Sequence, residues 1–146
     1  FDEGAGDDWS AENKMVANAK KAALLCLGAA YQRFLDKIEQ QQEVMAGIAD
    51  IAMAAYAMEG VTLRAQKLDQ AGKGTLPRAM AQVFNREQMD LVERTAKVVL
   101  AACGEGDTLR TSLMFLKRLT KYEPVNSIEL RRQIAARVLD QEKYAY

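Results

Sequence analysis

Apolar residues recur every three or four positions along most of this 146-residue chain, the spacing of one face of an α-helix. A first helix is expected from Ser10, whose hydroxyl is suited to capping it, to a bend near Asp36 in the charged stretch that follows. The apolar stripe of this amphipathic helix consists of Leu24, Leu27, Tyr31, Phe34 and Ile38.

The segment 44–68 is the longest run of apolar and small side chains. Asp50, Glu59 and Arg64 interrupt it too often for a membrane span, so we predict a long soluble helix. Its main stripe consists of Val44, Ile48, Ile51, Ala55, Met58 and Thr62. Because alanines and Tyr56 widen the apolar arc, this helix is expected to lie centrally, with partners on more than one side.

Glycines and proline then divide the second half of the chain. Gly72 and Gly74 are suited to ending the second helix, and Pro77 to the first turn of the third. The four-residue sequence at 104–107 is expected to stop this third helix. Its apolar stripe consists of Met89, Val92, Ala96, Val99 and Cys103.

A shorter fourth helix is predicted over about 108–122, because the residue before Pro124 is disfavoured in the α region. Asn126 and Glu129 resemble a capping box and open a last helix. No segment of useful length alternates with the period of a strand. Since the loops are short, consecutive helices should be antiparallel neighbours.

The composition agrees with this reading of the pattern. A hydrophobic content of 49% suits a globular core, and 9 Gly with 2 Pro are too few for an all-β fold. The predicted fold is all-α, an antiparallel helical bundle of four main helices plus a short one over residues 10–146. Residues 1–9, with the acidic start FDEGAGDD, are expected to be a linker inside a longer polypeptide.

Charge and residue types exclude several classes of chemistry. Lys and Arg together number 20, as do Asp and Glu, so the net charge is zero. The chain therefore lacks the excess of positive charge typical of proteins that bind nucleic acid. The absence of histidine removes Ser-His-Asp and Cys-His catalysis and histidine metal sites. Cys26 and Cys103 are expected to be buried small hydrophobes, with a disulfide or a reactive thiol as the alternative. We therefore assign no catalytic, cofactor-binding or metal-binding residue to this chain.

Two patterns invite a catalytic or phosphate-binding interpretation, and each has a simpler structural one. The sequence GKGT at 72–75 has Lys73 between two glycines, whereas a phosphate loop places lysine next to the hydroxyl residue after a strand. A helix–helix turn is therefore the favoured interpretation. Asp50 and Glu59 are nine residues apart and fall on opposite helix faces, so they are expected to be surface or inter-helix partners and not an acid–base pair.

The segment 109–124 is both basic and amphipathic. Basic heads around an apolar face are suited to an anionic membrane surface or to a partner protein. The alternative is an ordinary core helix with a solvated basic face. The candidate docking face consists of Arg110, Met114, Phe115, Lys117, Arg118 and Lys121.

The sequence IADIAMAAYAMEGVTLRAQK at 48–67, preceded by EQQQEVM, resembles the C-terminal region of very-long-chain-type acyl-CoA dehydrogenases. The last segment, 127–146, is similar to the closing helix of the mitochondrial branch of that group. The resemblance spans about residues 19–146 and is weakest at 69–88. The matching residues of the central motif are Gln42, Glu43, Ile48, Ala49, Asp50, Tyr56, Ala57, Met58, Arg64 and Ala65.

This resemblance implies a parent flavoenzyme of fatty-acid β-oxidation. In the family a glutamate base removes the α-proton of an acyl-CoA thioester, a β-hydride passes to FAD, and an electron-transferring flavoprotein takes the electrons. The family's base and FAD segments precede the matched region, so no catalytic residue transfers to this chain, and Glu59 does not match the base. FAD is implied for the parent protein and not for this segment.

The implied role is core packing, self-association or docking, without catalysis by the segment alone. The implied partners are the catalytic core of the same polypeptide, a second copy in a homodimer, or a membrane surface. The expected location is the bacterial cytoplasm, or the mitochondrial matrix or inner-membrane surface in a eukaryote. The alternative is a free-standing helical adaptor that binds a partner helix. A ligand pocket between the helices has no polar constellation in its favour.

Overall fold

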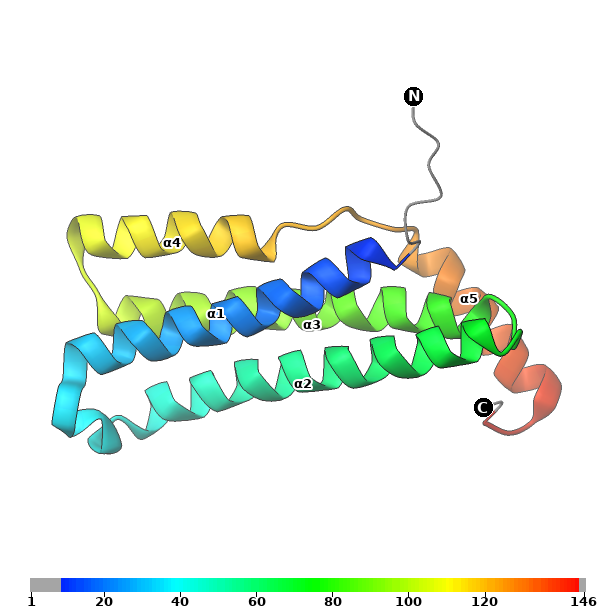
Figure 1. Ribbon diagram of the computed structural model, residues 1–146, viewed down its shortest axis with the longest axis horizontal. Coiled ribbons are helices and arrows are strands. Elements are labelled where there is room, and N and C mark those ends of the chain that lie inside the picture. The colour runs from blue at the N-terminus through cyan, green and yellow to red at the C-terminus, as the bar shows by residue number, and fades with distance from the viewer. Residues whose placement is uncertain (1–8, 145–146) are drawn as a thin grey trace, which may run out of the picture.

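The computed structural model describes residues 9–144 and contains no strand within them. Three long helices lie side by side, a fourth covers one end of this layer, and a fifth crosses the other end (Figure 1). The prediction of an all-α bundle is therefore confirmed. The elements are α1 Ser10–Phe34, the 3-10 helix η1 Leu35–Gln40, α2 Gln42–Gln70, α3 Leu76–Cys103, α4 Gly106–Thr120 and α5 Ser127–Gln141.

Several predicted helix ends are confirmed. α2 ends at Gln70, and Gly72 and Gly74 follow with φ values of 70° and 86°, which an L side chain rarely adopts. The side-chain oxygen of Asn126 accepts a hydrogen bond from the backbone N–H of Glu129 at 3.1 Å. Local turn chemistry thus sets these boundaries, as the sequence indicates.

Three other predictions about helix ends are wrong. Ser10 is the first residue of α1 and not its cap, because Trp9 precedes the helix and no side chain caps it. The fourth helix runs over Gly106–Thr120, two residues earlier than predicted at each end. α4 ends before the residue that precedes Pro124, and residues 121–126 form an extended linker to α5 (Figure 1). The expected linker at 1–9 lies outside the described residues except for Trp9.

The central helix is α3 and not α2. α3 contacts α1, α2, α4 and α5, whereas α2 contacts only α1, α3 and η1. The predicted stripe of α3, from Met89 to Cys103, is buried. The expectation that the wide apolar arc of 44–68 places this helix centrally is wrong, because Tyr56 on that arc is 79% exposed.

The predicted stripe of α2 is confirmed, since all six of its residues are buried. Among the described residues, α2 alone has the length and hydropathy of a membrane-spanning helix. Within the bundle, Ile51 and Met58 are fully buried in the core shared with α1 and α3. This packing buries 33% of the most apolar 18-residue window of α2.

On α1, small residues form the buried face. The first three residues of the predicted stripe, Leu24, Leu27 and Tyr31, are exposed instead, with Leu24 67% and Tyr31 62% exposed. Its last two, Phe34 and Ile38, are partly buried against the core. A short side chain on the inner face lets neighbouring helix backbones approach closely, so the bulky residues occupy the outer face. The residues of α1 that are fully buried are Ala19, Ala22, Cys26 and Ala30.

The expected pattern of antiparallel neighbours holds for the first four α-helices and fails for the last. The linker 121–126 carries the chain away from α4, and α5 packs against α3 at the opposite end (Figure 1). α5 contains no buried residue. It is therefore the least enclosed helix of the bundle.

α2 lies close against α3 at Gly47. A Cβ built there would lie 2.7 Å from Cγ2 of Val99, a buried and stiff β-branched residue.

Gly47→Ala is expected to destabilise the chain by about 1–2 kcal/mol, because overpacking outweighs the gain in helix propensity. The matched control is Gly60→Ala on the same helix, where nothing lies within 4 Å of the added Cβ. This control should stabilise by about 0.5–1 kcal/mol. Urea denaturation of both variants measures the difference, and equal effects would contradict the close approach.

Candidate functional site

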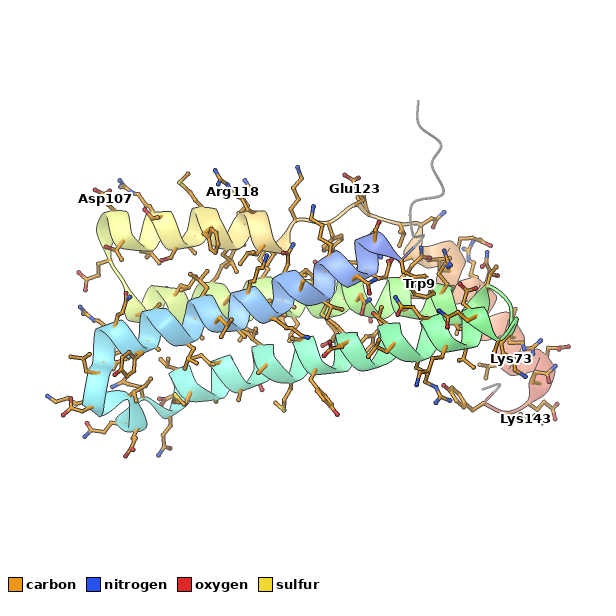
Figure 2. All side chains as sticks on the ribbon, viewed as in Figure 1. Trp9, Lys73, Asp107, Arg118, Glu123 and Lys143 are labelled. Carbon is orange, nitrogen blue, oxygen red and sulfur yellow. The ribbon has the colours of Figure 1, made fainter. Side chains whose placement is uncertain are left out.

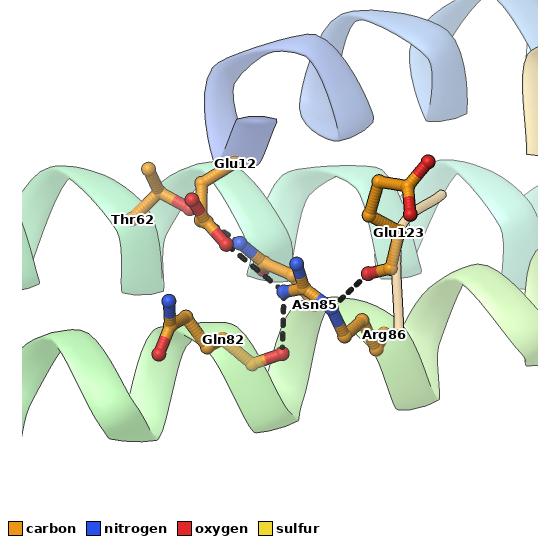
Figure 3. Close-up of polar contacts among 6 residues, drawn as sticks. All are labelled: Glu12, Thr62, Gln82, Asn85, Arg86 and Glu123. Atoms are coloured by element: carbon orange, nitrogen blue, oxygen red, sulfur yellow. Dashed lines mark hydrogen bonds and ion pairs between the residues drawn. The ribbon is translucent and has the colours of Figure 1, made fainter. Parts of the chain in front are cut away.

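A buried ion pair joins α1 to α3. Arg86 Nη1 lies 2.9 Å from Glu12 Oε1, and the Glu12 side chain is 2% exposed (Figure 3). Arg86 also donates to the backbone carbonyls of Gln82 at 3.0 Å and Glu123 at 2.9 Å. One guanidinium therefore ties together α1, α3 and the linker 121–126.

Tyr122 completes this contact on the linker side. The Arg86 guanidinium lies 5.9 Å from the centre of the Tyr122 ring, a cation–π geometry. The Tyr122 hydroxyl donates to Asp90 Oδ1 at 2.6 Å. Burial, followed by the hydrogen bond to Asp90, raises the pKa of Tyr122 to about 12. This hydroxyl is therefore a donor at neutral pH and not a general base.

A second polar contact lies beside the ion pair, between α2 and α3. Asn85 Nδ2 donates to Thr62 Oγ1 at 2.8 Å, and both residues are buried (Figure 3). Asn85 Oδ1 is buried without a hydrogen-bond partner. The polar cluster around Glu12 and Arg86 is thus largely satisfied from within, and its charged groups neutralise each other. Its geometry suits cross-linking of helices.

The predicted docking residues all lie on α4 or directly after it, and all are exposed. Figure 2 shows Arg118 on the side of α4 away from α3, and Glu123 further along in the linker. Met114 is 64% and Phe115 48% exposed. The docking role itself stays a prediction. All six predicted residues are classed as exposed: Arg110, Met114, Phe115, Lys117, Arg118 and Lys121.

The structure adds one basic residue that the sequence did not group with this face. Lys14 of α1 lines a cavity of about 480 Å³ together with Arg118 and Lys121. None of these three forms an ion pair among the described residues, whereas Arg110 pairs with Asp107 at 3.2 Å. Because α1 and α4 are distant in sequence, only their packing brings Lys14 to this edge.

The two cysteines behave as buried small hydrophobes, as predicted. Both are free and buried. Burial raises the pKa of the Cys26 thiol to about 12 and also raises the pKa of Cys103. Thiolates are the nucleophilic and metal-binding form, so neither sulfur is activated. Within residues 9–144, no group of three Cys, Asp or Glu side chains is placed to hold a metal ion.

The GKGT sequence at 72–75 and the carboxylates Asp50 and Glu59 have the structural roles that the sequence favours. Residues 72–75 form the turn between α2 and α3, as predicted. Glu59 pairs with Lys20 of α1 at 2.6 Å, and Asp50 is exposed. The two carboxylates therefore do not share a cavity.

A mostly apolar cavity lies at the end of the bundle where α5 crosses. Its volume is about 320 Å³, and its charged lining residues are Arg64 and Glu87. α2, α3 and α5 each contribute to its walls. Sequence reasoning found no constellation for such a pocket, because the three helices that form it meet only in the folded chain. The aliphatic and aromatic walls include Val61, Leu68, Met80, Val83, Phe84 and Ile134.

Comparison with known proteins gives one consistent answer. The family profile described as "Acyl-CoA dehydrogenase, C-terminal domain" matches residues 18–118. The chain belongs to this family. A "Probable acyl-CoA dehydrogenase" of Bacillus subtilis strain 168 is 37% identical over 136 residues, which cover 91% of this chain and 23% of that protein. The resemblance seen in the sequence is therefore confirmed at the level of the family.

A crystal structure of a relative has the same fold as this acyl-CoA dehydrogenase C-terminal domain. It is an acyl-CoA dehydrogenase from Bacillus anthracis complexed with FAD, 35% identical, with a TM-score of 0.92. The match covers 97% of this chain and 25% of the relative. The chain thus spans about a quarter of the length of both relatives.

In this C-terminal domain, the buried ion pair offers a direct test of its structural role. Arg86→Met is expected to destabilise the chain by about 3–5 kcal/mol, because it leaves the Glu12 carboxylate buried and unpaired. Glu12→Leu combined with Arg86→Met removes both charges and should restore most of that loss. Thermal melts followed by circular dichroism measure both. A double variant as unstable as the single one would contradict the pairing.

Proposed function

We propose that this chain is a non-catalytic C-terminal helical domain of an FAD-dependent acyl-CoA dehydrogenase-like oxidoreductase of fatty-acid β-oxidation. Its role in the proposal is to dock on the catalytic core of the same polypeptide. The observation that carries the proposal is a large exposed apolar surface on α1 and α2, here called the outer face. Its large residues are Leu24, Leu27, Tyr31, Met45, Met53, Tyr56 and Leu63.

The outer face is continuous across the two helices. The Lys20–Glu59 ion pair fixes the antiparallel register of α1 and α2. Counting from this pair, Leu27 of α1 lies opposite the exposed Ala52 of α2, and Leu24 lies one turn away beside Tyr56. Contiguous exposed apolar patches on soluble domains mark interaction surfaces.

The size of the relatives supports the catalytic core as the occupant. The chain corresponds to 23% of the Bacillus subtilis relative and 25% of the Bacillus anthracis one, so most of each relative lies outside the matched region. The charged clusters and the thiols of the described residues have structural roles, which supports a non-catalytic domain. In this proposal FAD binds to the parent protein outside this chain. The proposal includes transfer of electrons from the parent to an electron-transferring flavoprotein. It also includes a cytoplasmic location in a bacterium, or the mitochondrial matrix or inner-membrane surface in a eukaryote.

Introducing negative charges on the apolar outer face tests the docking proposal. Leu24→Glu with Tyr56→Glu should change the stability of the isolated chain by less than about 1 kcal/mol, because both side chains are exposed there. In the complete flavoenzyme the same pair should weaken docking, since burial of each side chain contributes roughly 1.5–3 kcal/mol. Limited proteolysis at the domain boundary and thermal melts measure this loss.

The matched control is Val98→Glu on α3, which is 70% exposed and lies outside the outer face. It should leave the complete enzyme unchanged. Equal proteolysis rates for wild type and the Leu24/Tyr56 variant would rule out docking through the outer face. Analytical ultracentrifugation of the isolated chain separates the homodimer alternative: a dimer abolished by the same substitutions would assign the face to self-association.

A second role, docking of α4 to an anionic surface, is favoured by its unpaired basic residues. Lys117, Arg118 and Lys121 form no ion pair among the described residues and flank the exposed Met114 and Phe115. Cations beside exposed apolar groups suit a membrane interface. This role uses a surface other than the outer face, so the two proposals are separable.

Vesicle sedimentation tests the α4 proposal. Lys117→Glu with Lys121→Glu should reduce binding to phosphatidylserine-containing vesicles by at least tenfold, since each basic residue near such a surface contributes about 1 kcal/mol. Binding of the wild-type chain should weaken as salt rises. Lys97→Glu on α3 is a control that makes the same kind of substitution, with half the charge change, outside α4. Unchanged vesicle binding in the double variant would remove membrane docking by this face.

A further inference from the structure

The cavity beneath α5 has the features of a ligand site. It is open to solvent and has a volume of about 320 Å³, and aliphatic and aromatic side chains from α2 and α3 dominate its walls. α5 contributes Ile134 to one side, and the exposed Tyr144 lies at the rim. Ligand sites for small molecules are concave, mostly apolar and polar at only a few points.

The charged groups at the cavity give it a net positive charge. Glu87 forms an ion pair with Arg131 of α5, so its carboxylate is neutralised. Arg64 is exposed and forms no ion pair or hydrogen bond among the described residues. A planar guanidinium at the edge of an apolar cavity is complementary to a carboxylate, which it can hold through two parallel hydrogen bonds.

α5 also leaves the cavity incompletely filled. This helix contains no buried residue, and among the other elements it contacts only α3. Its apolar Leu130 and Ile134 remain half-buried. Burial of this exposed apolar surface by a ligand would lower the free energy of the chain.

We infer that this cavity binds an amphipathic monocarboxylate, with its apolar chain between α2, α3 and α5 and its carboxylate on Arg64. Ion pairing across the cavity edge fixes the orientation of the ligand, and burial of its chain supplies most of the affinity. The inference concerns a site at the α5 end of the bundle and does not depend on what covers the outer face of α1 and α2.

The chain carries its own reporter for this site. Trp9 is the single tryptophan of the sequence and packs against Ala65, with Val61 beside it. Both Val61 and Ala65 also line the cavity. The indole is buried, donates to Asp69 at 3.2 Å and lies under the Arg78 guanidinium at 4.6 Å. A ligand that displaces water behind Val61 and Ala65 should therefore alter the emission of Trp9.

The test titrates the chain with octanoate, decanoate and 1-decanol below their micelle concentrations, by Trp9 emission and by isothermal titration calorimetry. Decanoate should bind saturably at one site per chain. Affinity should rise by about fourfold per added methylene, the factor that corresponds to about 0.8 kcal/mol for each buried CH₂. Arg64→Gln should weaken decanoate about fivefold, the upper range for an exposed ion pair, and leave 1-decanol unchanged.

The matched control is Arg94→Gln, which removes an exposed guanidinium of α3 that does not line this cavity. It should bind decanoate like the wild type. Three results would each overturn the inference: no saturable response to decanoate by either method, equal weakening in the Arg64 and Arg94 variants, or equal weakening of decanoate and 1-decanol in Arg64→Gln. Because both arginines are exposed, each variant is expected to fold, and circular dichroism verifies this.

Discussion

Close packing of small residues against α3 is the constraint on which the rest of this structure depends. From Ala19 to Ala30 the buried face of α1 is made of alanines and Cys26. Gly47 of α2 meets Val99 of α3 at a distance that leaves no room for a Cβ. Dense packing at such short helix separations is possible only where side chains are short. The polar cross-link from Arg86 to Glu12 then joins α1 to α3 at one end of this layer. Hydrophobic packing and one buried ion pair therefore fix the position of every other element.

This packing has a consequence for function, because it turns bulky apolar residues outward. When alanines fill the space between α1 and its neighbours, residues such as Leu24 and Tyr31 have no place in the core. The same holds for Tyr56 on α2. The resulting outer face is apolar, continuous and unusual for an isolated soluble domain. A domain of this family that occupies about a quarter of its relatives' length has a physical reason to carry such a face, since the remaining sequence of the relatives is available to cover it.

The candidate sites divide into those built within one helix and those built between helices. The basic face of α4 lies on one helix, so its spacing was visible in the sequence from Arg110 to Lys121. The cavity beneath α5 combines Arg64, Phe84 and Ile134, which are separated by up to seventy positions in the chain. The link between Glu12 and Arg86 is of the same kind, with 74 positions between its partners. No local pattern predicts such pairs, because a charged residue in a helix normally faces water.

The sequence by itself determined the helices, most of their ends and the family. Periodic apolar residues specify a helix locally, and glycines after α2 and Asn126 before α5 act on the backbone within one turn. The predicted buried faces of α2 and α3 are confirmed, whereas only the tertiary structure decided which face of α1 is buried. A stripe of Leu24, Leu27 and Tyr31 on α1 and a parallel stripe of alanines are both compatible with an amphipathic helix. Packing against α3 selects the alanines because they allow the closer approach. For the same reason the tertiary structure made α3 the central helix, left the wide apolar arc of α2 exposed, and separated α5 from α4.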